Sequence, residues 1–239
     1  MSDDRTDSGP ARDERPRGRR AAGARAERMR TGTESIREQK RLLRREMNRL
    51  LRRPAEADAR RAGARLLERV KAWMNADELT GEAAGAQPRI FAFASFGREP
   101  DTWQLLRWLW SRNRRVCLPR VEGRRMHFYP VPGEDDLAPT GYRGVAEPVG
   151  TGDPVLPASG DLIIVPGLAF TRDGARLGRG GGYYDRFLVR RASDSVAAGI
   201  GYRFQLLDSL PVGEHDAYVD DFWPLDSAGP PSPGPSSHS

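Results

Sequence analysis

The segment from Arg176 to Arg186 constrains the fold more than any other part of this sequence. It reads Arg-Leu-Gly-Arg-Gly-Gly-Gly-Tyr-Tyr-Asp-Arg and places four glycines within five positions. Glycine adopts positive φ at little cost and lets a backbone lie flat against a ligand, so the segment predicts a loop in close contact with a ligand. A flexible surface turn is the alternative for such a loop taken in isolation.

An apolar run precedes this loop and a helical pattern follows it. Residues 161–166 have the length and branching of a buried strand. Residues 183–192 are predicted to form a helix, because four positions follow the spacing i, i+3, i+4, i+7. These are Tyr184, Phe187, Leu188 and Arg191. The predicted order is therefore strand, connection, glycine loop and helix.

This order favours a phosphate site. The backbone amides of a helix start and the guanidinium groups of Arg176 and Arg179 meet at one place, which suits an anion. Asp185, in the first predicted turn, is suited to hold Mg²⁺. The segment lacks the Gly-Lys-Ser/Thr of a Walker A loop, and the third glycine of a dinucleotide fingerprint would fall on Tyr183.

Two strand-helix-strand units predict an α/β fold with an open, mainly parallel sheet. The first unit comprises residues 88–95, 101–110 and 115–121, with Asp101 as the helix cap; the second comprises residues 161–166, 183–192 and 196–201. Residues 126–131 and 142–145 are predicted as short edge strands. Ligands of such sheets bind beyond the carboxyl ends of the strands. Glu99, which follows the first strand, is therefore expected to face the same cleft as the glycine loop.

A basic helix begins the folded part of the chain. Ser35 and Glu38 have the spacing of a capping box, and Pro54 ends the helix that they start. Its apolar stripe comprises Ile36, Leu43, Met47 and Leu50. Lys40 and Arg44 lie one turn apart on a single face, which is either a solvated basic surface or an anion site. Only two of the 39 basic residues are lysine, which favours a phosphate role for Lys40. A second helix is predicted over residues 55–76, followed by a polar connection over 76–87.

The two ends of the chain are predicted to lie outside the folded domain. Residues 1–34 form an Arg-rich arm without apolar periodicity, and residues 227–239 form a Pro/Ser-rich tail. One α/β domain, residues 35–226, remains. The net charge of +6 is concentrated in the first helix, so a local anion site is favoured over a general nucleic-acid surface.

Neither secretion nor membrane insertion is expected from the sequence. No apolar signal segment follows the N-terminal arginines, and no run approaches 18 apolar residues. The single cysteine, Cys117, lies in an apolar run and is predicted to be a packed thiol in a reducing compartment. We therefore expect a cytoplasmic protein that binds neither a membrane nor nucleic acid, and most simply a monomer.

A second acidic segment lies near the end of the predicted domain. It contains His215, Asp216, Asp220 and Asp221. One histidine gives no zinc-ligand spacing, so a hard cation on Asp216 is the functional interpretation and an exposed acidic turn is the alternative.

Taken together, these segments resemble the 5-formyltetrahydrofolate cyclo-ligase family, also called 5,10-methenyltetrahydrofolate synthetases. The resemblance extends from about Glu38 to Trp223, and its most specific part is Leu-Gly-Arg-Gly-x-Gly-Tyr-Tyr-Asp. The other matching segments are Lys40–Arg44, Glu99–Thr102, Leu118–Arg120, Glu147–Pro148, Val165–Phe170 and His215–Asp216 with Asp220.

The resemblance implies a Rossmann-like α/β fold related to sugar-phosphate isomerases and CoA transferases. It implies an enzyme that uses ATP and Mg²⁺ to convert 5-formyltetrahydrofolate into 5,10-methenyltetrahydrofolate, ADP and phosphate. Arg179 and Lys40 would be catalytic, with Asp185 and Asp216 holding Mg²⁺. The implied ATP-binding residues are Lys40, Arg41, Arg44, Arg176, Leu177, Gly178, Arg179, Gly180, Gly181, Gly182, Tyr183 and Tyr184. The implied folate-binding residues are Ala94, Glu99, Arg179, Gly180, Gly182 and Tyr183. Some relatives carry a lysine at the position of Gly181.

Two other classes of function stay open from the residues alone. A sugar-phosphate isomerase or CoA-transferase relative would share the fold, but Lys40, Arg44 and the tyrosine pair argue against it. An RNA-binding protein would use the basic arm and the first helix, which lack aromatic residues interleaved with the charges.

Overall fold

The computed structural model describes residues 35–80, 87–150 and 152–225. The predicted arm and tail, residues 1–34 and 227–239, lie outside the described residues. The predicted division into an arm, one domain over residues 35–226 and a tail stays a prediction.

A six-stranded mixed sheet forms the centre of the molecule. In spatial order it comprises β10 (Asp221–Pro224), β9 (Val196–Gly201), β6 (Leu162–Pro166), β1 (Ile90–Phe91), β2 (Val116–Glu122) and β3 (Arg125–Pro130). All neighbours are parallel except β2 and β3, which form an antiparallel hairpin. The predicted mainly parallel α/β sheet is confirmed.

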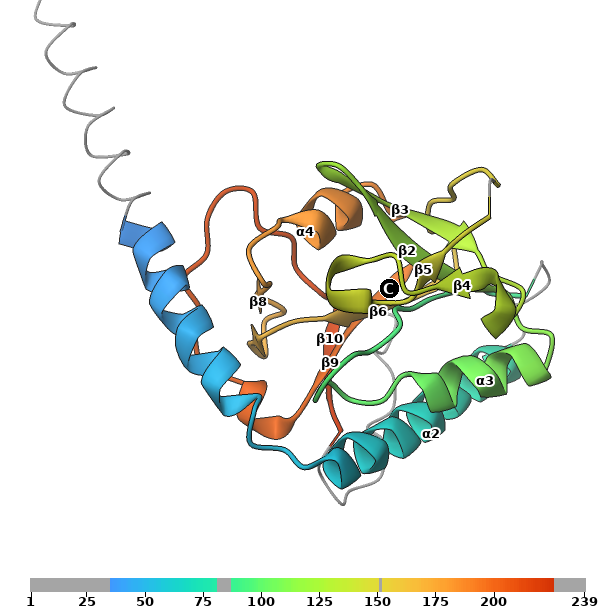
Figure 1. The fold of residues 1–239 in the computed structure, drawn as a ribbon, viewed down its shortest axis with the longest axis horizontal. Coiled ribbons are helices and arrows are strands. Elements are labelled where there is room, and N and C mark those ends of the chain that lie inside the picture. The colour runs from blue at the N-terminus through green and yellow to red at the C-terminus, as the bar shows by residue number, and fades with distance from the viewer. Residues whose placement is uncertain (1–34, 81–86, 151, 226–239) are drawn as a thin grey trace, which may run out of the picture.

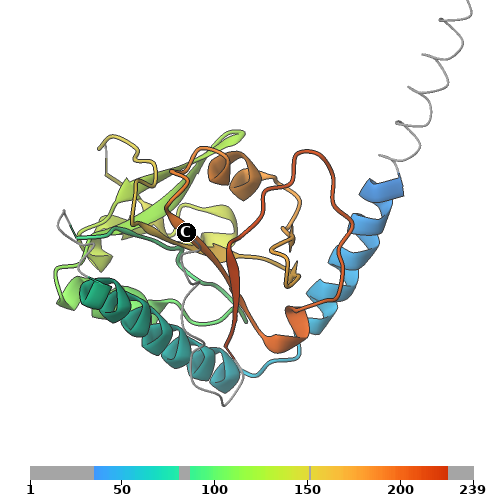
Figure 2. The ribbon, with the colours of Figure 1, turned by 180° about the vertical axis from the view of Figure 1, so that it is seen from behind.

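Helices cover both faces of this sheet. Helices α2 (Glu56–Thr80) and α3 (Trp103–Ser111) lie side by side on one face, and α4 (Tyr183–Leu188) lies on the other (Figures 1 and 2). Both faces of a parallel sheet are thereby buried, which accounts for the continuous apolar runs of β6 and β9. The first described helix, residues 35–50, stands apart at the edge of the sheet.

The strand order places a topological switch point between β1 and β6. From β1 the chain passes through α3 to β2 on one side, whereas from β6 it passes through α4 to β9 on the other. The chain therefore leaves β1 and β6 in opposite directions, and the carboxyl ends of these two strands are where ligands bind in sheets of this kind. Glu99 follows β1 and the glycine loop follows β6, as the sequence predicts.

The helix over residues 35–50 packs on a small hairpin instead of on the sheet. This hairpin consists of β7 (Ala169–Phe170) and β8 (Arg176–Leu177). Met47, 1% exposed, contacts a cluster with Leu168, Ala169 and Leu177. Apolar burial therefore holds the basic helix against the segment that leads into the glycine loop.

Short elements complete the fold. Strands β4 (Leu137–Ala138) and β5 (Glu147–Pro148) form a second antiparallel pair. Three 3₁₀ turns cover Glu134–Asp136, Tyr142–Gly144 and Arg203–Gln205. The predicted strand over residues 142–145 is wrong: Tyr142 is 78% exposed, and Val145 donates its backbone N–H to the carbonyl of Tyr142.

Several predicted boundaries differ from those observed. Helix α4 ends at Leu188 and not at residue 192. The backbone N–H groups of Arg190 and Arg191 bond the carbonyls three residues back, and that of Ala192 bonds the carbonyl of Pro157. Helix α2 continues four residues past the predicted residue 76. Within the predicted strand over residues 88–95, only Ile90 and Phe91 pair with both neighbouring strands, β2 and β6.

The predicted helix caps also differ. Ser35 already has helical conformation, and Glu38 pairs with Arg41 instead of completing a capping box. Thr102, not Asp101, occupies the N-cap of α3, although the Asp101 carboxylate accepts the N–H of Trp103 at 2.9 Å.

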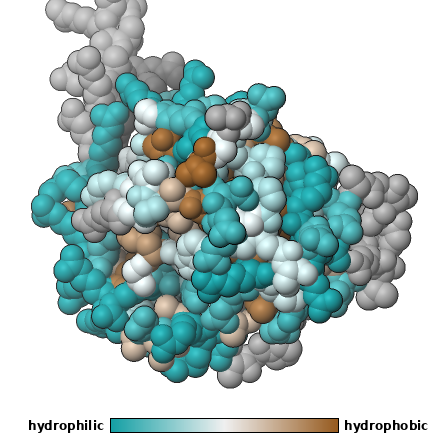
Figure 3. Space-filling model, turned by 45° about the vertical axis from the view of Figure 1, so that its right-hand side comes forward, coloured by the Kyte–Doolittle hydropathy of each residue, from teal (hydrophilic) through white to brown (hydrophobic). Residues whose placement is uncertain are grey.

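Cys117 is confirmed as a buried free thiol, 1% exposed in β2. Burial raises the pKa of this thiol to about 12, so it stays protonated at neutral pH. In the described part of the chain, no helix has the length and apolar character needed to cross a membrane. The face in Figure 3 is mainly hydrophilic, with hydrophobic side chains in small separate groups.

A buried ion pair joins the starts of β1 and β6. The side chain of Asp161, 5% exposed, accepts hydrogen bonds from the Arg89 guanidinium at 2.6 Å and from the backbone N–H groups of Arg89 and Ala158, both at 2.7 Å. We predict that Asp161→Ala lowers the free energy of unfolding by about 3–5 kcal/mol, because it leaves a largely buried cation and two amides without an acceptor. Urea unfolding measures the change. Glu134→Ala, which removes the exposed pair with Arg107, should cost less than about 1 kcal/mol and is the control.

Candidate functional site

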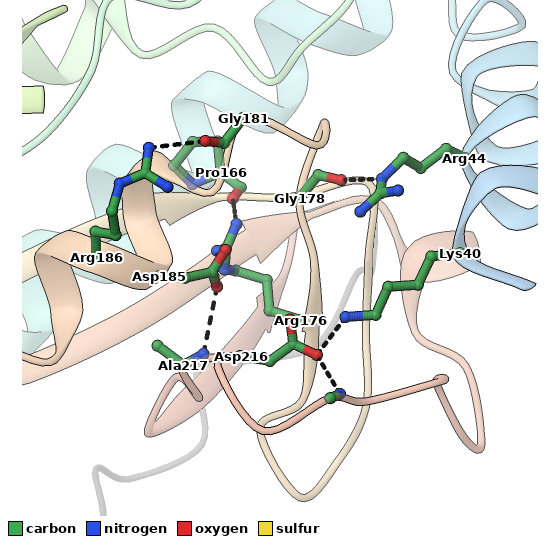
Figure 4. A network of polar contacts seen from close by, with 11 residues as sticks. Lys40, Arg44, Pro166, Arg176, Gly178, Gly181, Asp185, Arg186, Asp216 and Ala217 are labelled. Atoms are coloured by element: carbon green, nitrogen blue, oxygen red, sulfur yellow. Dashed lines mark hydrogen bonds and ion pairs between the residues drawn. The ribbon is translucent and has the colours of Figure 1, made fainter. Parts of the chain in front are cut away.

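A polar pocket of about 230 Å³ lies between the first described helix, the glycine loop and the segment before β10. Figure 4 shows the polar contacts around it. Its lining residues are Lys40, Arg44, Arg176, Leu177, Gly178, Gly180, Gly182, Asp185, Arg186, His215 and Asp216. Four cationic side chains and two carboxylates therefore surround one small space.

The glycine loop owes its shape to two residues in the left-handed region. Gly180 has φ of 110° and Gly182 has φ of 65°, values that side chains with a Cβ rarely adopt. Arg44 Nε donates to the carbonyl of Gly178 at 2.9 Å, so the first helix also holds the loop. The predicted meeting of Lys40 and Arg44 with the glycine loop is observed, across more than 130 residues of sequence.

Two ion pairs join the elements that line the pocket. Lys40 Nζ contacts Asp216 Oδ2, which also accepts the backbone N–H of Gly213 at 2.6 Å. Arg176 Nη2 donates to Asp185 Oδ1 at 2.7 Å, and the same oxygen accepts the N–H of Ala217 at 3.3 Å. Each carboxylate thus uses one oxygen, and its other oxygen has no partner among the described residues.

This donor set fits a hard divalent cation. Mg²⁺ is usually held by one or two carboxylates together with phosphate oxygens and water. Asp185 and Asp216 line the same pocket, and each keeps one oxygen for such a ligand. The other predicted acidic residues lie elsewhere in contacts of their own: Asp220 pairs with Arg191, and Asp221 accepts the indole N–H of Trp223. Across the described ranges, no group of three His, Cys, Asp or Glu side chains is arranged to hold a metal.

Glu99 meets the glycine loop through Arg179. The Glu99 carboxylate accepts a hydrogen bond from Arg179 Nη2 and weakly from the N–H of Phe96, at 3.4 Å. The Arg179 guanidinium lies 5.5 Å from the Phe96 ring and is 3.3 Å from Asn48 Oδ1. Glu99, which follows β1, and Arg179, which follows β6, therefore meet here, and Arg179 is half-exposed beside the pocket.

Some expected residues lie outside the pocket lining. Arg41 is exposed and pairs with Glu38. Ala94 is buried, with 4% of its surface exposed. Tyr183 lies beside the turn between β2 and β3, with its hydroxyl 3.4 Å from the Gly123 carbonyl. Their assigned roles stay predictions. Helix α4 has only six residues, so its dipole is weaker than the sequence implied and side-chain cations supply most of the positive charge.

Two contributors were missed from the sequence. Arg186 lines the pocket, and Asn48 contacts Arg179. The i, i+4 spacing of Arg44 and Asn48 on one helix face is the only signal that could have identified Asn48. Arg186 could have been identified as a cation in the first turn after the glycines.

Tyr184 and Arg176 form an incompletely satisfied polar pair. The Tyr184 ring packs edge-on against Phe128, and the Arg176 guanidinium lies 5.6 Å from the tyrosine ring. The Tyr184 hydroxyl and Arg176 Nε are buried without a hydrogen-bond partner among the described residues. Burial raises the pKa of the tyrosine hydroxyl, which therefore remains a donor. A bound ligand that offers an acceptor would satisfy it.

Comparison with known proteins gives a consistent result. The model of the 5-formyltetrahydrofolate cyclo-ligase family matches residues 36–223. A 5-formyltetrahydrofolate cyclo-ligase of Mycolicibacterium smegmatis is 32% identical, over 62% of this chain and 76% of its own length. The enzyme of the same name from Mus musculus is 32% identical, over 56% of this chain and 71% of its own. The solution structure of Aquifex aeolicus 5,10-methenyltetrahydrofolate synthetase superposes with a TM-score of 0.63 at 28% identity, covering 83% of this chain and 99% of that one.

We predict that Tyr184→Phe leaves the free energy of unfolding of the ligand-free protein unchanged or raises it by up to about 1 kcal/mol, because it removes a buried hydroxyl that has no partner. Tyr202→Phe is the matched control. It removes a hydroxyl that donates to the Arg98 carbonyl at 3.0 Å, and it should destabilise the protein by about 1–2 kcal/mol. Chemical denaturation of the two variants measures both changes. A loss in Tyr184→Phe equal to that in Tyr202→Phe would show that the Tyr184 hydroxyl is satisfied without a ligand.

Proposed function

This chain belongs to the 5-formyltetrahydrofolate cyclo-ligase family, and on that premise we propose that its polar pocket binds the phosphates of ATP while the adjoining Glu99–Arg179 region binds the folate. The observation that carries the proposal is the junction at the glycine loop. Gly178 and Gly180 line the cation-rich pocket, and Arg179 between them contacts Glu99. One loop therefore adjoins both subsites.

The charge of the pocket supports the phosphate assignment. Its lining has four cationic groups against two carboxylates, which favours an anionic ligand. Guanidinium groups bind phosphate oxygens through two parallel hydrogen bonds, and the ammonium of Lys40 acts as a compact point charge. A triphosphate that displaces Asp216 from Lys40 would free that carboxylate for the metal.

The Glu99–Arg179 contact supports the folate assignment. Glu99 is 14% exposed in its side chain and offers a carboxylate to the donor groups of a pterin-like ring. When such a ring binds Glu99, Arg179 is released from its ion pair. Its guanidinium is then available for the phosphoryl group that passes between the two subsites.

The reaction transfers the terminal phosphoryl group of ATP to the formyl oxygen of 5-formyltetrahydrofolate. A formamide oxygen is a poor leaving group, and phosphorylation converts it into a good one. The neighbouring folate nitrogen then attacks the formyl carbon, loses its proton and closes the ring. Phosphate carries the former formyl oxygen away. Such a transfer needs positioning and charge stabilisation more than a protein nucleophile.

Mg²⁺ would be held by Asp185 and Asp216, whose unpartnered oxygens fit it, and would neutralise charge on the phosphates. The chain's own cations bind and orient the triphosphate. Arg179 stabilises the charge that develops on the transferred group. Arg179 is next to Gly180 in the loop, so the oxygen atom that accepts the phosphoryl group would also be held close to the loop.

The alternatives are less well supported. The family match favours the cyclo-ligase over a sugar-phosphate isomerase or CoA transferase. The arm on which an RNA-binding function would depend lies outside the described residues. The expected cytoplasmic location and monomeric state remain predictions.

We expect Lys40→Ala to raise the Michaelis constant for ATP about 10- to 100-fold, because it removes a charged hydrogen bond to phosphate. Lys71→Ala is the matched control, since Lys71 is the only other lysine and pairs with Glu68 on the surface of α2. The near-UV absorbance of the methenyl product follows the reaction. Equal ATP constants for the wild-type protein and Lys40→Ala would remove Lys40 from the site.

Arg179→Ala should lower turnover about 10²- to 10³-fold with a much smaller effect on folate binding, because a cation on developing charge acts mainly in the transition state. Single-turnover kinetics and folate titration separate the two effects. Arg172→Ala, an exposed arginine at the tip between β7 and β8, is the control. A folded Arg179→Ala variant with normal turnover would contradict the assignment.

Asp185→Asn and Asp216→Asn are each expected to raise the Mg²⁺ concentration needed for half-maximal activity, since an amide is a weaker ligand for a hard cation. Asp208→Asn, an exposed aspartate outside the pocket, serves as the control. Magnesium titration at fixed ATP measures the shift. Unchanged titrations for both pocket variants would exclude these carboxylates as ligands.

A further inference from the structure

Arg186 lies on the opposite side of the glycine loop from Arg44 (Figure 4). It belongs to the last turn of the six-residue helix α4 and lines the pocket. Its Nη2 donates to the carbonyls of Gly181 and Arg124, both at 2.8 Å, and its guanidinium lies 5.3 Å from the Tyr183 ring. These contacts fix the guanidinium beside the loop.

The ion pairs of the pocket leave two cations without a carboxylate. Lys40 is paired with Asp216, and Arg176 is paired with Asp185. The contacts of Arg44 and Arg186 within the described part of the chain are to carbonyl oxygens, which do not neutralise a charge. The excess positive charge of the pocket therefore resides on these two arginines.

Arg44 and Arg186 also hold the loop in the same way. Arg44 uses Nε on the carbonyl of Gly178, and Arg186 uses Nη2 on the carbonyl of Gly181. Each guanidinium keeps further N–H groups that have no acceptor among the described residues. One nitrogen of each guanidinium thus fixes the loop, and the remaining N–H donors stay available to a ligand.

We infer that Arg186 is a further phosphate-binding residue, which acts with Arg44 as a two-sided clamp on the triphosphate of ATP. This inference deepens the proposed function and rests on it. The clamp also accounts for the four glycines of the loop, because they place no side chain between the two arginines and the phosphates.

The test measures phosphate binding directly. Isothermal titration gives the dissociation constants of inorganic tripolyphosphate and of ATP for wild type, Arg186→Gln, Arg44→Gln and the control Arg190→Gln. Arg190 is exposed one turn further on and lies outside the pocket lining. Arg186→Gln and Arg44→Gln should each weaken both ligands about 10- to 100-fold, because a charged donor to phosphate is lost. Arg190→Gln should bind like wild type.

Two further measurements separate binding from loop support. Arg186→Lys keeps the charge but loses the fork, so its tripolyphosphate affinity should fall between those of wild type and Arg186→Gln. In the wild-type protein, the NMR signal of Arg186 Nε–H should shift when tripolyphosphate is added, whereas that of Arg190 should not. The second measurement needs no variant to fold.

The outcomes distinguish the inference from the proposed function. Arg186→Gln with wild-type affinity, beside a weakened Arg44→Gln, would overturn the role of Arg186 alone. An unshifted Arg186 signal in a protein saturated with tripolyphosphate would do the same. Wild-type affinity in Arg44→Gln, Arg186→Gln and Lys40→Ala together would show that ATP binds elsewhere, and the proposed function of the pocket would fail.

Discussion

The burial of one guanidinium group governs the arrangement of this site. The side chain of Arg176 is only 3% exposed, and a buried cation is costly unless it is paired and hydrogen-bonded. Asp185 supplies the pair, and the carbonyl of Pro166 accepts a further, longer hydrogen bond at 3.4 Å. The cation thereby ties strand β8 to the end of β6 and to the first turn of α4. Because Asp185 also accepts the N–H of Ala217, the segment before β10 is fixed at the same place.

The first helix completes the site from outside the sheet. Burial of Met47 and its neighbours on the β7–β8 hairpin positions Lys40 and Arg44 over the glycine loop. Apolar packing thus positions the first helix, and the charged side chains of that helix remain available to bind a ligand. The incomplete pairing of the pocket, with open carboxylate oxygens and open guanidinium N–H groups, is what the proposed site for a metal and a polyphosphate requires.

Much of the fold was predictable because its strands are buried on both faces. The runs at 161–166 and 196–201 are short, apolar and bounded by turn residues, and the observed strands coincide with them within one residue. The errors occur where tertiary contacts override a local pattern. Arg191 continues the helical spacing of α4, but the next N–H, that of Ala192, bonds the carbonyl of Pro157 instead of a helical carbonyl. Tyr142–Gly144 form a 3₁₀ turn and pair with no strand in the described part of the chain.

The sequence by itself determined the α/β class, the glycine loop and the placement of that loop and Glu99 at one cleft. These follow from periodicity and from the rule that ligands bind at the carboxyl ends of parallel strands. Only the tertiary structure decided which charges neutralise one another. Asp185 and Asp216 were both expected as metal ligands, yet each is paired with a different cation, and among the described residues the hydrogen bonds of Arg186 go to carbonyls. Periodicity indicates which face of one helix or strand is buried. An ion pair between two elements depends on their relative orientation, and that orientation is set by tertiary packing.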